Sequence, residues 1–299
     1  MKALWYAKWL VKAVTPPILL LGVKWIAIGL GLRRRDPEGQ GGQTPSHESD
    51  VPEWEYVPEG WQRETTGWTV EAVARSYREK WPAYVAAIQA PRPLGVYHET
   101  PEVREGDYSA QGMLVSFAYV LALAGRKRDR ISVLDWGGGL GHYYALARTV
   151  LPELALDWHC KETPAVCAEG RQVLPEVTFY EDDSCLDGRY DLVLASSSLQ
   201  YSEDWQTLLV GLAAAADRHL YVARTPVARR SESFVVLQRA HAYGYETEYL
   251  GWVVNRAELL ERAAAAGLGF AREFLLEAWF WADGAPENPV EHRSFLFNR

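Results

Sequence analysis

The sequence predicts an α/β fold in which helices cover both faces of a doubly wound, mostly parallel sheet. Two observations support this prediction. From Gln111 onward, apolar segments of helical and strand character alternate along the chain, and one strand runs through a glycine-rich stretch, Val133 to Gly141, into a helix. With 299 residues, of which 48% are hydrophobic, the chain is long enough for one globular domain with extensions.

The expected elements follow in order. Helices are expected at Gly112–Ala124, His142–Val150 and Pro164–Leu174, and strands at Ile131–Asp135, Leu154–Lys161, Val177–Tyr180 and Tyr190–Ala195. Thr163 before Pro164 predicts one helix start. Asn255, with Glu258 three residues later and Gly267 beyond, predicts a second capped helix. Two last strands, Ala271–Trp281 and Arg293–Phe297, predict a closing hairpin with one antiparallel strand.

Charge and cysteine content exclude several functions. The chain has 31 basic and 39 acidic side chains, a net charge of −8, and no sustained basic face, which argues against nucleic acid as a partner. Cys160, Cys167 and Cys185 do not have the spacing of a disulfide framework or a paired zinc site, so a reducing cytoplasm is expected. The acidic residues after Asp182 do not follow the spacing of a calcium loop, and we expect no metal.

The N-terminal part predicts a segmented organisation. Residues 1–35 combine tryptophans, lysines and an apolar run that ends in three arginines, which predicts an amphipathic segment. This segment either lies on the inner face of the cytoplasmic membrane, beside anionic lipid, or packs on the protein's own core. Residues 36–53 are expected to be a flexible linker, residues 54–110 an aromatic N-terminal cap, and residues 111–299 the α/β domain.

The glycine-rich stretch distinguishes two classes of ligand. A dinucleotide fingerprint fails in both frames, because His142 or Tyr144 stands where a glycine is needed. The frame that fits is acidic-x-Gly-x-Gly-x-Gly, which begins at Asp135. It resembles motif I of the class I S-adenosylmethionine-dependent methyltransferases. The resemblance implies a Rossmann-like, seven-stranded sheet, S-adenosyl-L-methionine as cofactor, and cofactor binding at Asp135, Gly137, Gly138, Gly139 and Gly141.

Three further landmarks follow at the expected strand ends. Glu162 lies 21 positions beyond Gly141, which suits an acid that accepts the ribose hydroxyls. Asp182, after the third strand, is the preferred acceptor for the adenine amino group, although a solvated acidic turn is the alternative. Ser196 and Ser197 follow the fourth strand, where they can meet the methionine part of the cofactor.

A narrower resemblance covers the chain from about Trp54 to Phe297. The blocks Leu134–Gly141, Glu162–Pro164 and Ser196–Tyr201, and more weakly Asn255–Glu258, resemble a family of bacterial methyltransferases linked to cell-surface polysaccharide biosynthesis. This resemblance implies a saccharide or lipid-linked glycan acceptor. Trp136 departs from the pattern, because such loops often carry a smaller or different residue there.

Methyl transfer to a hydroxyl oxygen requires a group that takes the proton, and histidine is the usual candidate near neutral pH. His241, between the predicted fifth strand and the next helix, is the first candidate, and Tyr201 is the second. The tryptophans of the expected cap either stack on sugar rings or pack on the sheet. Two other functions stay open: aminopropyl transfer with a related cofactor, and a non-catalytic, membrane-associated scaffold that keeps the fold.

Overall fold

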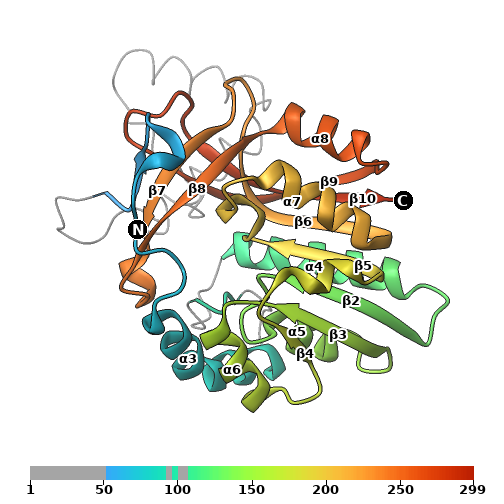
Figure 1. The fold of residues 1–299 in the computed structure, drawn as a ribbon. Helices are drawn as coiled ribbons and strands as arrows, with labels where there is room; N and C mark the ends of the chain where they lie inside the picture. The colour runs from blue at the N-terminus through green and yellow to red at the C-terminus, as the bar shows by residue number, and fades with distance from the viewer. Residues whose placement is uncertain (1–51, 92–95, 100–106) are drawn as a thin grey trace, which may run out of the picture. The chain divides into compact units, whose positions relative to one another are not determined.

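The computed structural model describes residues 52–91, 96–99 and 107–299 (Figure 1). The predicted amphipathic segment 1–35 and nearly all of the predicted linker lie outside these residues. The described residues belong to one compact unit. In Figure 1 the strands of this unit form a curled sheet with helices on either side.

The described residues form one ten-stranded sheet, and the order of seven of its strands, here called the main sheet, confirms the predicted doubly wound fold. They pair in the order β4-β3-β2-β5-β6-β10-β9, and only β10 runs antiparallel to its neighbours. Their bounds are β2 (Arg130–Trp136), β3 (Ala155–Lys161), β4 (Thr178–Tyr180), β5 (Tyr190–Ser196), β6 (Ala216–Ala228), β9 (Gly269–Phe280) and β10 (Val290–Asn298). The order reverses between β2 and β5, and in open α/β sheets the crevice that binds ligands is found at the carboxyl ends of the strands beside such a reversal.

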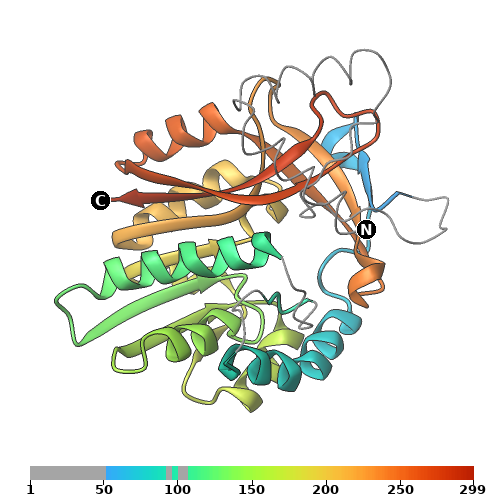
Figure 2. The same ribbon diagram turned by 180° about the vertical axis from the view of Figure 1, so that it is seen from behind.

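Helices cover both faces of this sheet, as Figures 1 and 2 show from opposite sides. One face packs against α3 (Glu71–Gln89), α4 (Tyr108–Gly125), α5 (His142–Val150) and α6 (Pro164–Val173), and the other against α7 (Trp205–Ala215) and α8 (Arg256–Ala265). Successive side chains of β2 point to opposite faces of the sheet, which explains the two hydrophobic cores. Val133 belongs to the core on the first face and Leu134 to the core on the second.

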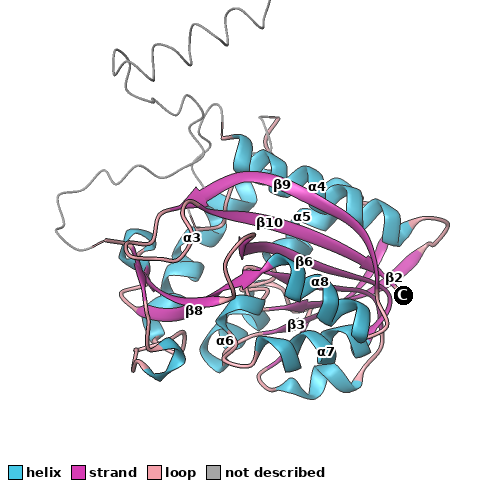
Figure 3. Cartoon of the chain, turned by 90° about the horizontal axis from the view of Figure 1, so that it is seen from above, coloured by secondary structure: helices cyan, strands magenta, loops and turns pink. Residues whose placement is uncertain are grey.

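A small antiparallel sheet extends the main one, and the sequence analysis did not predict it. It consists of β1 (Trp54–Tyr56), β7 (Phe234–Arg239) and β8 (Glu248–Asn255), and β8 joins the last two residues of β6. Trp54, assigned to the cap by the sequence, stacks on Phe280 of β9 with ring centroids 4.0 Å apart. Residues 54–110 therefore supply a strand and two helix segments that pack on the same body (Figure 3).

The two predicted helix starts differ in how they are made. Asn255 Oδ1 accepts from the Glu258 backbone N–H at 3.0 Å, which confirms the predicted cap of α8. The Thr163 side chain makes no capping bond, and α6 begins instead with Pro164 at its first position. The Glu258 carboxylate accepts from Ser233 and Gln206 rather than completing a reciprocal capping box.

Candidate functional site

The glycine loop lies at the carboxyl end of β2, beside the crevice. Gly137, Gly139 and Gly141 all have positive φ, at 72°, 60° and 89°. Residues that carry a side chain adopt this backbone conformation only with strain. A Cβ on Gly137 would lie 2.5 Å from Ser198 Cβ, and one on Gly139 would lie 2.6 Å from His142 Nδ1. The loop is therefore closely packed against the β5 and α5 sides, and its conformation requires glycine.

Glu162 is joined directly to this loop. At the end of β3 its Oε1 accepts from the Gly139 N–H at 3.1 Å, and its Oε2 accepts from the Thr163 N–H at 2.8 Å. Burial raises the pKa of Glu162, while these two N–H donors partly offset the rise. The half-buried carboxylate thus has a fixed orientation beside the loop, and each oxygen keeps a lone pair for another donor.

Asp135 has a different position from the one expected. Its side chain is fully buried beneath the loop, and a Cβ on Gly138 would lie 2.5 Å from its Oδ2. Neither carboxylate oxygen has a hydrogen-bond partner, and burial together with the nearby Glu162 charge raises the pKa of Asp135 to about 8. Asp135 therefore supports the underside of Gly138 and does not face the crevice.

The serines after β5 lie next to the glycine loop. Ser198 Oγ donates to the Trp136 backbone carbonyl at 2.6 Å, and Ser196 Oγ exchanges a hydrogen bond of 2.8 Å with the Tyr143 hydroxyl. Ser197 adopts a φ of 51° and accepts from Gln200 Nε2 at 3.1 Å. These contacts place Ser196 and Ser197 at the same carboxyl edge as the loop, as the sequence predicted.

Asp182 lies exposed at the first residue of the turn after β4. Its Oδ1 accepts from the backbone N–H of Ser184 at 3.0 Å and from the Ser184 hydroxyl, and these bonds lower the pKa of Asp182. One carboxylate oxygen therefore caps the turn. The assignment of Asp182 to the adenine amino group stays a prediction.

Aromatic side chains form a wall on one side of the loop. The Trp68 ring stacks on the Tyr249 ring with centroids 4.0 Å apart, and its centroid lies 4.9 Å from that of Tyr201. A Cβ placed on Gly139 would lie 3.5 Å from Tyr77 Cε2. The Tyr201 hydroxyl donates to Gln238 Oε1 at 3.1 Å. Tyr201, a predicted catalytic residue, thus belongs to the wall, and its hydroxyl is already engaged with β7.

Two histidines lie beside the glycine loop, and neither of them is the first candidate base predicted from the sequence. His142, at the start of α5, stacks on His98 with ring centroids 4.1 Å apart. Burial lowers the pKa of His98 to about 4 and holds that of His142 well below its ordinary value, so both rings are neutral near pH 7. His142 Nδ1 is buried without a hydrogen-bond partner.

A buried ion pair completes this part of the site. Arg224, which lies within β6 between buried residues and has a φ of 52°, donates to Glu99 Oε1 at 3.0 Å, and His98 Nε2 lies 3.3 Å from the same oxygen. Glu99 Oε2 is buried without a partner. Burial opposes the charge of Glu99, but the Arg224 charge outweighs it and lowers the pKa of Glu99 to about 2.

His241, the first candidate base, is not among these residues. It lies exposed in η4 (Ala240–Tyr243), the turn between β7 and β8, while Ala240 beside it is buried. The reason is the unpredicted hairpin, which places residue 241 at its turn.

His159 donates to or accepts from the Tyr180 hydroxyl at 3.1 Å within the sheet. Among the described residues, no group of His, Cys, Asp and Glu could hold a metal ion.

No model of a protein family matches the chain, and no curated protein matches its sequence. Solved structures with a similar fold include a magnesium protoporphyrin IX methyltransferase from Synechocystis with bound S-adenosylmethionine, at 16% identity and a TM-score of 0.46 over 79% of this chain and 100% of that one. A 1,6-didemethyltoxoflavin methyltransferase from Burkholderia thailandensis has 16% identity and a TM-score of 0.45 over 82% and 99% of the two chains.

A third similar structure is an amino pentose methyltransferase from Micromonospora echinaspora, with 16% identity and a TM-score of 0.39 over 62% of this chain and 89% of that one. At identities and TM-scores this low, the likeness concerns the fold alone. The substrates of these proteins are therefore not transferred to this chain.

Proposed function

We propose that this chain is an S-adenosyl-L-methionine-dependent methyltransferase. The observation that supports this best is the hydrogen bond from the Gly139 N–H to Glu162 Oε1. It places a carboxylate, the acceptor that a pair of ribose hydroxyls requires, beside a glycine loop at the switch point of a doubly wound sheet. The sequence frame that fails for a dinucleotide is the one that suits this smaller cofactor.

Unpartnered polar atoms fit the same proposal. Eleven buried side-chain atoms of the described residues lack hydrogen-bond partners, and Glu99 Oε2, His142 Nδ1 and Gln200 Oε1 are three of them. Buried polar groups are nearly always paired in proteins, so a ligand bound beside these three atoms would supply the missing partners. The donor and acceptor set suits a ligand with hydroxyl and amino groups.

The roles of the residues follow from their positions. When bound, the cofactor supplies a methyl group on a positively charged sulfur. The glycine loop lets its backbone approach the ligand, Glu162 accepts from the ribose hydroxyls, and Asp182 accepts from the adenine edge. Ser196 and Ser197 hold the amino acid part. Asp135 keeps Gly138 in place from beneath.

The proposed acceptor is a hydroxyl group of a saccharide or a lipid-linked glycan intermediate. The partly exposed rings of Trp68 and Tyr201 support this, because aromatic faces bind the apolar faces of sugar rings, whereas Tyr249 is buried against both and only supports them. His98 is the group placed to accept the hydroxyl proton. It is neutral near pH 7 and lies against His142, beside the glycine loop.

The same proposal includes the cellular location of the protein. The protein acts in the cytoplasm, and its residues 1–35 hold it at the anionic inner face of the cytoplasmic membrane, where a lipid-linked acceptor would be found. Packing of this segment on the protein's own surface is the alternative.

Calorimetric titration of the full chain tests the proposal before any acceptor is known. We expect binding of S-adenosylmethionine and of its demethylated product, and no binding of NAD. Binding of NAD alone would reject the cofactor assignment. Binding of none of the three would favour the non-catalytic scaffold. A search for aminopropyl transfer becomes worthwhile only if decarboxylated S-adenosylmethionine binds more tightly than the methyl donor.

Replacement of Glu162 by Ala tests the central contact. The variant loses a charged acceptor for the ribose hydroxyls and for the Gly139 N–H, so we expect affinity for S-adenosylmethionine to fall about tenfold to a hundredfold. Glu181→Ala is the matched control, because Glu181 is exposed and pairs with Arg171. Equal affinities in the wild type and Glu162→Ala, by calorimetry, would contradict the site assignment.

A further inference from the structure

Helix α4 is apolar on all sides, although only half of it is buried. Its 18 residues include no charged side chain, and by length and composition alone it could cross a membrane, yet 50% of it is buried against the sheet. A helix on the surface of a globular protein normally turns a polar face to solvent. Apart from the tyrosine hydroxyls, the uncovered half of α4 exposes one polar side chain, Gln111.

The uncovered residues lie along one side of the helix, which we call the α4 face. Tyr108, Val115 and Tyr119 are 67%, 59% and 44% exposed, and their spacing of seven and four residues places them in one row. Gln111, Gly112 and Ala122 lie on the same side of the helix, and the exposed Gln111 amide adds one polar group to it. This row extends along nearly the whole helix.

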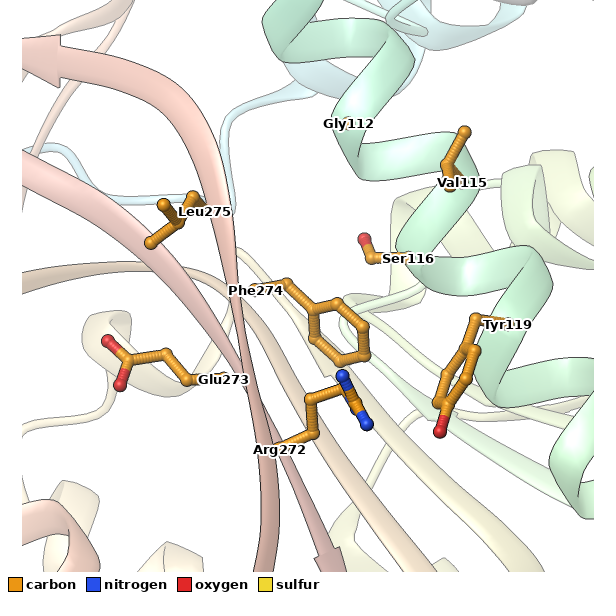
Figure 4. A pocket seen from close by; sticks show the side chains of 8 residues that line it. All are labelled: Gly112, Val115, Ser116, Tyr119, Arg272, Glu273, Phe274 and Leu275. Atoms are coloured by element: carbon orange, nitrogen blue, oxygen red, sulfur yellow. The ribbon is translucent and has the colours of Figure 1, made fainter.

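A groove of about 350 Å³ continues the α4 face towards the edge strand β9 (Figure 4). The Phe274 ring lies on its floor, 5.6 Å from the Tyr119 ring. At one end the Arg272 guanidinium lies 5.3 Å from the centre of the Tyr119 ring. The groove is thus apolar along its length and has a cation beside its aromatic end.

Basic side chains follow the α4 face directly. Arg126 and Lys127 are exposed in the turn after α4, and neither forms an ion pair with another described residue. Arg128 and Arg130 are partly neutralised by Asp191 and Asp157. Asp129 is also exposed in this turn, so residues 126–130 carry four basic side chains and one acidic side chain, in a chain of net charge −8.

We infer that the α4 face and its basic turn contact the surface of an anionic lipid bilayer. The apolar row and tyrosine rings match the interfacial layer of a membrane, and Arg126, Lys127 and Arg272 match its negative headgroups. This charge complementarity favours an anionic bilayer, because an apolar row with basic side chains beside it is the combination that binds at the surface of anionic lipid. The inference does not depend on methyl transfer, and it adds a contact made by the folded body to the proposed contact of residues 1–35.

A fluorescent label on the α4 face tests the inference in the full chain. The native cysteines Cys160, Cys167 and Cys185 are buried, so a new surface cysteine can be labelled selectively. Val115→Cys is labelled with an environment-sensitive nitrobenzoxadiazole dye. Val210→Cys is the matched control, because Val210 is 50% exposed on α7, which covers the opposite face of the sheet.

We expect a blue shift and a rise in emission at position 115 with vesicles of phosphatidylcholine and phosphatidylserine, and no change with phosphatidylcholine alone. Position 210 should not respond to either. An unchanged spectrum at 115, or equal shifts at both positions, would overturn the inference. A shift at 115 that follows protein concentration without vesicles would identify a second copy as the occupant, and would overturn it as well.

Charge reversal in the basic turn provides an independent test. Arg126→Glu with Lys127→Glu should abolish the vesicle-dependent shift at position 115, and it should leave binding of S-adenosylmethionine unchanged, because the turn lies at the amino end of β2, away from the glycine loop. A full emission shift in this variant would contradict the proposed contact between the basic turn and the anionic headgroups. Failure of cofactor binding in all forms would reject the proposed function without affecting the label's result.

Discussion

Two carboxylates at the glycine loop have opposite surroundings. Glu162 accepts two backbone N–H groups, while Asp135 is enclosed under Gly138 without any hydrogen-bond partner. Its surroundings favour the protonated form, which explains why the pKa of Asp135 rises to about 8. The spacing of the sequence placed both acids at the site, but spacing cannot distinguish a carboxylate that faces a ligand from one that supports the loop.

The Asp135 carboxyl group should make stability depend on pH. Its pKa is near 3.8 when the chain is unfolded and about 8 in the fold, so between these values the unfolded chain releases the proton and the folded chain keeps it. Stability contributed by this group is therefore lost as the pH rises from about 4 to about 8. In Asp135→Asn this loss should disappear.

Urea unfolding of the cofactor-free protein at about pH 5 and about pH 8 checks this expectation. The wild type should lose more unfolding free energy than Asp135→Asn between the two values. Parallel losses in both proteins would show that Asp135 is ionised in the fold.

His98 and His241 should differ in their effect on turnover. His98→Gln removes the neutral imidazole beside the glycine loop, so we expect kcat to fall by about a hundredfold or more. His241→Gln alters only an exposed turn and should leave kcat within about twofold. The measurement is formation of the demethylated cofactor with an acceptor found among glycan intermediates. A larger effect at His241 would reverse the assignment.

At the scale of single elements, the start of α8 depends on one side chain. Asn255 Oδ1 accepts from the Glu258 N–H, and Asn255 Nδ2 donates to the Ser231 carbonyl at 2.6 Å. Asn255→Ala should therefore reduce the free energy of unfolding by about 1 to 2 kcal/mol. Thr163→Ala, at the start of α6, is the control and should cost little, because Thr163 makes no side-chain cap. Denaturant unfolding compares the two, and equal costs would contradict this assignment.

The elements that the sequence predicted best have strong local signals. The β2 strand, the glycine loop and α5 follow one another without a gap, and Asn255 marks the start of α8. The β7 and β8 strands lack such signals. Phe234–Leu237 is a short apolar run whose period cannot distinguish a strand from a buried helix, and its partner β1 lies far away in the chain.

The same limit applies to the site. Glu162 could be predicted because its distance from the loop in sequence is set by one βαβ unit. The pairing of Arg224 with Glu99 spans 125 positions, and nothing near either residue indicates the other. His98 became a candidate only once the fold had brought it against His142.

At the scale of the whole molecule, deletion of residues 1–35 should weaken membrane attachment. The segment carries the tryptophans, lysines and arginines expected to bind anionic lipid, so the shortened protein should sediment less with anionic vesicles. Affinity for S-adenosylmethionine, measured by calorimetry, should not change. If the shortened form sediments as fully as the complete chain, the segment does not hold the protein at the membrane.

The position of β10 in the main sheet affects how the chain can fold. β10 lies between β6 and β9, and its pairing with β6 brings Phe297 opposite Leu220. During synthesis, this side of β6 stays open while three further strands and a helix are made. Until β10 arrives, the apolar side chains of β6 are available for wrong pairings, and such long-range closure is slow. The main sheet can therefore close only after β10 has been made.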